Sequence, residues 1–258
     1  MKPGLVLILF ISLICILGII LPLDYNAMDN ENRFSPPGFK NLMGTDNFGR
    51  DVFSRVLAGA RFTLFTALLT VAGSAAAGSV LGLLSGFAGG FLDEIIMRIM
   101  DTLSSFPGIL LALVMVSLMG NSTGTLIIAL LILFIPGFTR IMRNGMLQYK
   151  EKDFVLLAHI AGVPPYRIIF VHILPNLFSQ LLSASVLGLS NAILAESTMS
   201  YLGLGIQPPV PSWGRMLSES QVFLFNAPWC ALAPGFMIML TVLGFHFLGD
   251  GLRDRAEK

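Results

Sequence analysis

The sequence predicts an all-α membrane protein with six transmembrane helices and a helix–Gly–helix segment between the fourth and fifth spans. Hydrophobic residues make up 55% of the 258 residues and charged residues only 12%. The mean hydropathy of +0.79 is far above that of an ordinary soluble domain. The apolar residues gather in runs long enough to cross a bilayer, and short polar segments separate these runs.

The charge balance excludes one class of function. The net charge is +1, and no basic patch with interleaved aromatic residues is present, so we expect no nucleic-acid partner. Both cysteines, Cys15 and Cys230, lie in or beside apolar stretches, where thiols usually act as small buried hydrophobes.

Residues 1–61 are expected to form the first span and an outer polar loop. The apolar run from Leu5 to Leu23 fits a bilayer core of about 30 Å, and no small-x-small cleavage site follows it. A retained span is therefore favoured over a signal peptide. In the loop that follows, five acids balance five bases, and Asp51 is placed to cap an interfacial helix over residues 52–61.

Residues 62–248 are expected to form the core, and residues 249–258 a short cytoplasmic tail. Small residues recur at Gly78, Gly82 and Gly86, which predicts a helix packed inside the bundle. Gly89-Gly90 ends that span, and an amphipathic helix follows at the membrane surface. The predicted ranges are 62–88 for the second span, 91–101 for the amphipathic helix, and 102–119 (bent or started at Pro107), 125–142, 177–195 and 227–248 for the later spans.

The segment 150–176 is polar and then amphipathic, and it predicts an elbow of two short helices. Gly162 permits a left-handed turn, and Pro164-Pro165 suits the start of a second helix that runs to Pro175, where the next span can begin. Apolar residues recur at helical spacing in both arms, with faces made by Phe154, Leu157, Ala158 and Ala161, and by Tyr166, Ile169, Phe170 and Ile173.

The distribution of basic residues predicts on which side the elbow lies. With a cytoplasmic N-terminus and six spans, ten of the sixteen Lys and Arg residues fall on the inner side, and five of the other six lie in the one long first loop. This polarity puts both termini and the elbow in the cytoplasm and the segment 196–226 outside.

Sequence motifs for catalysis are missing. The only glycine-rich turn of interest, 120–124, lacks the Gly-Lys-Ser/Thr ending of a phosphate-binding loop. His159, His172 and His246 do not have metal-ligand spacing, and no Gly-x-Ser-x-Gly nucleophile motif occurs, so neither a metal site nor a catalytic residue is expected. Glu196, at the outer end of the fifth span, is the acid most exposed to membrane burial; we weigh a functional role against an interfacial side chain that reaches water or caps a following turn.

The elbow resembles the "EAA" loop of permease subunits of ATP-binding-cassette importers. That pattern reads Glu-Ala-Ala, three residues, Gly, nine residues, then Ile-x-Leu-Pro, and Ala158, Gly162, Leu174 and Pro175 fall on its spacing. Departures from it resemble the branch that imports peptides and nickel: Leu156, Leu157 and His172 replace the Glu, the first Ala and the Ile.

Two outer segments resemble the same branch. One is Gly-Thr-Asp-x-x-Gly-Arg-Asp at residues 44–51, for which a structural role is favoured: Gly44, Thr45, Asp46, Gly49, Arg50 and Asp51. The other covers residues 196–214, where an outer gate or binding-protein contact is weighed equally against a scaffold: Glu196, Tyr201, Gly203, Gly205, Trp213 and Gly214. We expect Tyr201, Trp213 and Trp229 to form an interfacial belt.

The resemblance implies the second, C-type permease subunit of a dipeptide, oligopeptide or nickel importer in the inner membrane. Such a subunit forms half of a pore with a homologous permease, rests on two ATPase subunits that bind ATP and Mg²⁺, and receives cargo from a substrate-binding protein. It needs no cofactor of its own. The residues implied in ATPase coupling are Lys152, Asp153, Phe154, Leu157, Ala158, Gly162, Pro165, Leu174 and Pro175.

Three alternatives stay open at this point. The cargo could be a nickel chelate, because nothing in the spans distinguishes it from a peptide. The chain could also be a membrane scaffold without transport, or an intramembrane enzyme that uses Glu196 and a histidine. The enzyme hypothesis is weakened by the predicted topology, which puts Glu196 and the elbow histidines on opposite sides of the membrane.

Overall fold

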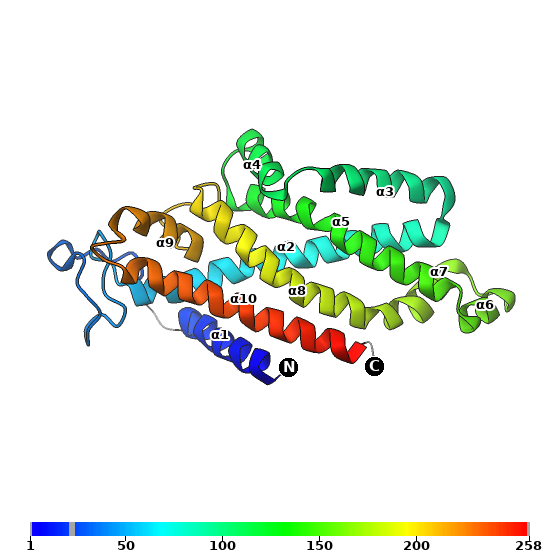
Figure 1. The fold of residues 1–258 in the computed structure, drawn as a ribbon, viewed down its shortest axis with the longest axis horizontal. Coiled ribbons are helices and arrows are strands. Elements are labelled where there is room, and N and C mark those ends of the chain that lie inside the picture. Colours follow the sequence, from blue (N-terminus) through cyan, green and yellow to red (C-terminus); the bar gives the residue numbers. More distant parts are fainter. Residues whose placement is uncertain (1, 21–23, 257–258) are drawn as a thin grey trace.

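A computed structural model describes residues 2–20 and 24–256, and the regular elements within these ranges are helices. Long helices lie side by side along the longest axis of the molecule (Figure 1). They are α1 (Lys2–Ile20), α2 (Val52–Ala88), α5 (Thr123–Lys150), α8 (Leu174–Tyr201) and α10 (Trp229–Ala256). The shorter elements are α3 (Gly90–Ser105), α4 (Gly108–Met119), α6 (Asp153–Ile160), α7 (Pro165–Arg167), α9 (Trp213–Ser220), the 3-10 turns Asn30–Asn32 and Gln221–Phe223, and the π-helical segment Ile168–Ile173.

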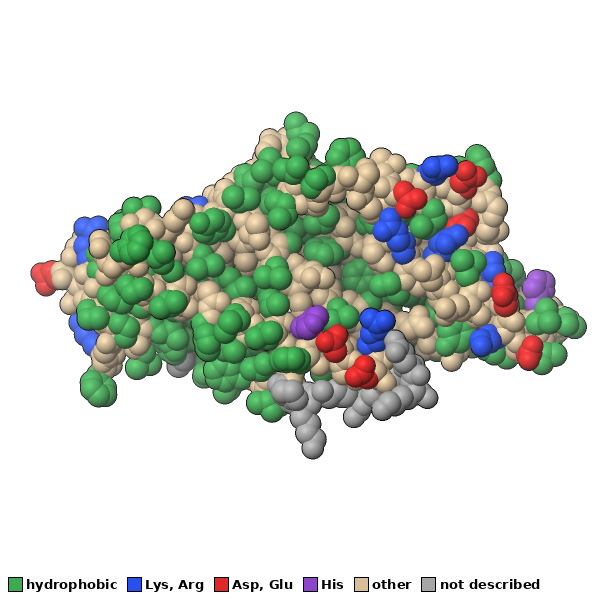
Figure 2. Space-filling view, in the orientation of Figure 1, with side chains coloured by type: hydrophobic (Ala, Val, Ile, Leu, Met, Phe, Trp, Pro, Cys, Tyr) green, Lys and Arg blue, Asp and Glu red, His purple; other side chains and the backbone are tan. Residues whose placement is uncertain are grey.

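Four helical segments are long and apolar enough to cross a membrane, and a bent pair of helices can supply a fifth span. Hydrophobic side chains cover much of the left and middle of the molecule, and charged side chains lie at its left end and over its right half (Figure 2). The predicted first span, residues 5–23, extends beyond the described part of α1, because residues 21–23 lie outside the described residues. The four segments are Val52–Ala88, Thr123–Lys150, Pro165–Tyr201 and Trp229–Asp254.

Helix α2 begins where the sequence predicts and is longer than expected. The Asp51 carboxylate accepts a 2.8 Å hydrogen bond from the Ser54 backbone N–H, which is the predicted N-cap. The prediction of a separate interfacial helix over residues 52–61 is wrong, because these residues are the first turns of one continuous 37-residue helix. No residue between Val52 and Phe62 breaks the helical hydrogen bonding, and Gly89 with φ +63° ends the helix as predicted.

The glycine series of α2 packs against α5, which confirms the predicted internal face. A Cβ atom added at Gly78 would lie 2.5 Å from Phe138 Cβ, and one added at Gly86 would lie 2.8 Å from Met146 Cβ. Such close approach of two helices maximises dispersion contacts where lipid supplies no hydrophobic driving force. The α2–α5 pair therefore forms the centre of the bundle.

The predicted third span, residues 102–119, is bent at Pro107, as the sequence predicts, and its first residues belong to α3. Helix α3 continues to Ser105, α4 starts at Gly108, and the two meet at 90° around Pro107. Pro107 cannot donate a backbone hydrogen bond, so the chain turns there. In contrast, α5 passes through Pro136 and runs eight residues beyond the predicted end at residue 142.

The second arm of the elbow is continuous with the following span. Helix α7, the π-helical segment and α8 make one helical stretch, Pro165–Tyr201. Helix α8 starts at Leu174, so Pro175 lies in its first turn, where the next span is predicted to begin and where a missing N–H costs little. The helix also continues past residue 195, so Glu196 lies within α8 and not beyond its end.

Candidate functional site: the elbow and the outer polar network

The elbow turns at Gly162. Its φ of +77° is in the left-handed region, and the N–H groups of Gly162 and Val163 donate 3.0 Å bonds to the carbonyls of His159 and Ala158. These bonds close the C-terminus of α6. A Cβ atom at Gly162 would meet no atom within 4 Å, so the backbone conformation and not the space explains the glycine.

The two arms of the elbow bury one side and expose the other. Val155, Ile168 and Ile173 join a core cluster with Met142 and Met146 of α5. The other side carries large apolar side chains that are 42 to 76% exposed, and we call them the elbow ridge: Phe154, Leu157, Ile160, Tyr166 and Phe170. The predicted faces are therefore only partly buried, since Ile169 and Ile173 are buried and Ala158 is half-buried, while Phe154, Leu157, Ala161, Tyr166 and Phe170 are exposed.

The residues predicted to couple to an ATPase lie on or beside the elbow ridge. Lys152 and Asp153 are exposed at the start of α6, where the Asp153 carboxylate complements the helix dipole. Pro165 and Pro175 are also exposed, whereas Leu174 and Ala158 pack partly against the core cluster. The structure thus brings the predicted set together on one projecting segment (Figure 1).

Ion pairs fasten α3 to α5 near the elbow. The Arg143 guanidinium donates 2.5 and 2.6 Å bonds to the two oxygens of Asp93, and the Ser85 hydroxyl also donates to Asp93. The bonds from Arg143 make the largest contribution, and with the bond from Ser85 they lower the pKa of Asp93 to about 2. Arg140 adds a 2.9 Å ion pair with Asp101. The bidentate Asp93 pair fixes the amphipathic helix beside the C-terminal half of α5.

At the opposite end, the segment 44–51 folds as a compact turn. The Asp46 carboxylate accepts hydrogen bonds from the backbone N–H groups of Phe48 and Arg50 and a 2.6 Å bond from the Arg50 side chain. Thr45 Oγ1 accepts from Ser35 N–H at 2.8 Å, and Gly44 and Gly49 take left-handed conformations. These bonds give the predicted structural role a definite form: the motif shapes the outer loop and caps α2.

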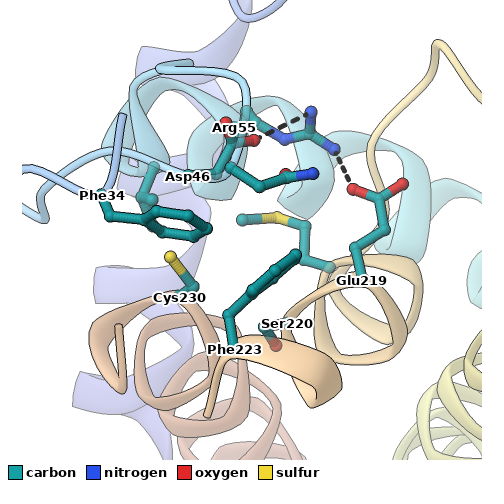
Figure 3. Close-up of a pocket in the computed structure, with 10 residues that line it drawn as sticks. Phe34, Asp46, Arg55, Glu219, Ser220, Phe223 and Cys230 are labelled. Atoms are coloured by element: carbon teal, nitrogen blue, oxygen red, sulfur yellow. Dashed lines mark hydrogen bonds and ion pairs between the residues drawn. The ribbon is translucent and has the colours of Figure 1, made fainter. Parts of the chain in front are cut away.

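This turn is joined to α9 by a cluster of charged side chains (Figure 3). Arg55 donates a 3.0 Å bond to Glu219, and Arg50 donates a 3.3 Å bond to the same carboxylate oxygen. Arg55 also lies 3.6 Å from Asp46, and Arg215 bonds the second oxygen of Glu219 at 3.2 Å. A cavity of only about 20 Å³ lies beside the cluster, so it can accommodate little more than a water molecule.

Glu196 is completely buried, and hydroxyl groups surround its carboxylate. Ser200 Oγ donates a 2.6 Å bond to it, and the hydroxyls of Thr63 and Ser212 are further partners. Each of these hydroxyls also accepts from a backbone N–H, of Ile206, Trp213 and Arg215 respectively. Their protons are therefore free to point at Glu196, which links α2, α8 and the outer segment. The alternative that Glu196 is an interfacial side chain reaching water is wrong, because the side chain is completely buried.

The outer segment packs tightly on α8. An added Cβ would overlap Ser197 at Gly214, 2.7 Å from its Cα, and Ser200 at Gly205, 2.6 Å from its Cα. Trp213 is fully buried, and its indole N–H donates a 3.0 Å bond to the Val56 carbonyl. The expected interfacial place of Trp213 is therefore wrong; Trp229 is half-buried and bonds Thr45 O, while Tyr201 is 39% exposed and Gly203 turns the chain.

Sequence reasoning missed the partners of these predicted residues. In the sequence, Arg55 is only one of five basic residues that balance five acids in the first loop. No local pattern pairs it with Glu219, which is 164 residues away. Thr63, Ser200 and Ser212 also carry no pattern of their own. The Asp93–Arg143 pair could have been suspected only from the amphipathic pattern of α3, which predicts a charged face without naming the partner.

Taken with the apolar middle and the exposed elbow ridge, these features define a multi-pass membrane protein whose projecting segment lacks a covering partner within the described chain. Residues 78–258 match the family described as "Binding-protein-dependent transport system inner membrane component". The chain belongs to this family: it is a permease subunit of an ATP-binding-cassette importer in the inner membrane, and this family is not one of enzymes.

Named relatives match over nearly the whole chain. The dipeptide transport system permease protein DppC of Alkalihalophilus pseudofirmus is 42% identical over 98% of this chain and 84% of its own length. DppC of Haemophilus influenzae is 39% identical, over 98% and 88%. The glutathione transport system permease protein GsiD of Pectobacterium atrosepticum is 38% identical, over 98% and 85%.

Proposed function

We propose that this chain forms one half of a pore that imports short peptides. Relatives at 38 to 42% identity over 98% of the chain carry names that specify dipeptide or glutathione transport, and glutathione is itself a tripeptide derivative. No feature of the described residues favours a nickel chelate over a peptide. The second half of the pore is a homologous permease subunit, and this chain corresponds to the second, C-type subunit.

The elbow ridge carries the proposal for coupling. Leu157, Ile160, Tyr166 and Phe170 are each more than 60% exposed, although their neighbours Val155 and Ile168 are buried. An apolar ridge rimmed by Lys152 and Asp153 suits the groove of a soluble partner. We assign that groove to one of two ATPase subunits, which bind ATP and Mg²⁺; this chain itself needs no cofactor.

The topology follows from the same assignment. With six spans, counting α1 and the bent α3–α4 pair, the N- and C-termini and the elbow lie in the cytoplasm. The ion cluster, α9 and the outer segment then face the substrate-binding protein. The segment 196–226 holds Glu196, Tyr201, Gly203, Gly205, Trp213 and Gly214, and its tight packing on α8 supports a rigid platform for that contact.

Reconstitution tests the proposal. The chain is co-expressed with its homologous permease and ATPase subunits, purified, and placed in vesicles with the loaded binding protein. We expect ATP-dependent uptake of a labelled dipeptide and no uptake of a nickel–histidine chelate. Uptake of only the nickel chelate would show that the cargo is a nickel chelate and not a peptide. A chain that neither retains an ATPase on purification nor supports uptake would be a scaffold.

A further inference from the structure

An unexplained feature of the apolar part of the molecule is an open cavity of about 570 Å³ between α5 and α8. Its α8 wall consists of residues spaced three and four apart, which form one continuous helix face: Gln180, Ser183, Ala184, Leu187, Gly188 and Asn191. The α5 wall has the same spacing at Phe134, Gly137, Phe138 and Ile141. The two facing helix surfaces therefore leave an open space between them, whereas helices inside a protein usually pack closely.

The lining has the composition of a ligand site. Carboxamide side chains lie at both ends of the α8 wall, Gln180 and Asn191, and the apolar residues Ala184 and Leu187 lie between them. A mostly apolar cavity of this volume with a few polar groups is typical of small-molecule sites. Polar side chains that line such a space inside a membrane protein are functional candidates by default.

Helix α5 contains a proline next to the cavity-lining residue Gly137. Pro136 lies inside α5 and has no N–H, so the carbonyl of Ile132 loses its helical hydrogen bond. Next to it, an added Cβ at Gly137 would meet no atom within 4 Å, so the space in front of this residue is open.

On the basis of the proposed transport function, we propose that this cavity is a transient binding site for the peptide cargo within the span region. Gln180 and Asn191 are 11 residues apart, about 16 Å along the helix axis. An extended chain advances about 3.3 to 3.6 Å per residue, so about four residues span this distance and a shorter peptide fits within it. Carboxamides both donate and accept hydrogen bonds, as peptide groups require, and the apolar middle accommodates side chains. Arg253 of α10 also lines the cavity.

A filling substitution tests occupancy. Gly137→Leu puts a side chain into the open space without an internal clash, and Gly124→Leu in the first turn of the same helix is the matched control, because its nearest atom is 3.8 Å away. In vesicles with the complete transporter, Gly137→Leu should lower uptake of the dipeptide Ala-Phe at least tenfold while binding-protein-stimulated ATP hydrolysis is retained. Gly124→Leu should match the unmodified chain.

A photoreactive dipeptide locates the cargo directly. During turnover, a dipeptide of alanine and benzoylphenylalanine should form adducts within residues 134–141 and 180–191, and Gly137→Leu should abolish them. The double variant Gln180→Ala, Asn191→Ala should lower uptake and adduct yield several-fold while the subunits still assemble.

The outcomes separate the two proposals. If the unmodified complex shows no ATP-dependent dipeptide uptake, the transport function itself is wrong. If it transports and Gly137→Leu transports equally well, or the adducts map elsewhere, the cavity is not a cargo site. If Gly137→Leu instead prevents co-purification of the second permease, the cavity is a packing surface for that subunit and the inference is overturned.

Discussion

The guanidinium of Arg55, in the first turn of α2, donates a 3.0 Å hydrogen bond to the carboxylate of Glu219 in α9, 164 residues later in the chain. The Arg55 side chain is only 3% exposed, whereas Glu219 is 25% exposed. This contact joins the start of α2 to the segment that precedes α10.

Removing Glu219 should destabilise the outer end of the molecule. Glu219→Ala leaves the buried Arg55 charge with only Asp46 at 3.6 Å, and loss of one partner of a buried pair costs about 3 kcal/mol. We expect the melting temperature in detergent to fall by about 6 °C or more. Glu94→Ala, an exposed acid of α3, is the control; an equal shift in both variants would contradict the role of the cluster.

Replacing Glu196 should release the outer segment. Glu196→Leu removes the shared acceptor of four hydroxyls, and each donor left unsatisfied costs about 1 to 3 kcal/mol. Proteinase K should then cut within residues 202–212 much faster than in the unmodified chain. Glu196→Gln keeps one acceptor oxygen and should give intermediate protection; identical cleavage in all three proteins would show that the network does not hold the segment.

Gly214 should tolerate no side chain. In Gly214→Ala the new methyl group overlaps the backbone of Ser197, and overpacking of this kind costs about 1 to 3 kcal/mol. The yield of folded, monodisperse protein after purification should fall. Gly124→Ala, at an open helical position, should leave the yield unchanged, and a normal yield for Gly214→Ala would mean that α9 can move away from α8.

Gly162→Val should impair coupling without preventing membrane insertion. Valine in the left-handed region costs about 1 to 2 kcal/mol, so the two arms of the elbow will reorient to relieve it. We expect loss of peptide uptake or of ATPase co-purification. Gly162→Asn tolerates the same backbone conformation and should retain most activity; normal uptake with Val would remove the elbow from the coupling mechanism.

The Asp93–Arg143 pair should give a stability difference that depends on acidity. The pKa of Asp93 lies at about 2, below its ordinary value of 3.8, so the pair stabilises the fold fully above about pH 4 and progressively less as the pH falls toward 2. The melting-temperature gap between the unmodified chain and Asp93→Asn should be constant from pH 7 to 5 and shrink below pH 4. A gap that widened in acid would contradict this pairing.

Helix type and location were largely predictable from the sequence, because each depends on local pattern. The cap at Asp51, the stop at Gly89 and the turn at Gly162 all follow from residues within one helical turn. The boundary errors have a common cause: apolarity marks where a helix lies in lipid, whereas its hydrogen bonding continues into water. Helices α2 and α5 therefore extend beyond the predicted spans.

The interior of the site was not predictable in the same way. The partners of Glu196 come from α2, α8 and the loop before α9, and no spacing in the sequence brings Thr63 beside Ser212. Tryptophan is a residue type expected in an interfacial belt. Trp213 is nevertheless buried in the core, next to the close contact between Gly214 and Ser197. Burial of these residues is a property of tertiary packing, which periodicity does not report.

The unbroken helix from Pro165 to Tyr201 has a mechanical consequence. Its 37 residues correspond to a rod of about 55 Å, with the elbow ridge at one end and the Glu196 network near the other. Such a rod acts as a lever, and a tilt of about 5° moves its far end by about 5 Å. The π-helical segment lies between Tyr166 and the cavity wall with Gln180 and Asn191. Its wider turn therefore affects the direction in which Tyr166 points relative to that wall. Under the proposed coupling function, a force applied at the elbow end would therefore move the cavity wall and the segment beyond Glu196 together.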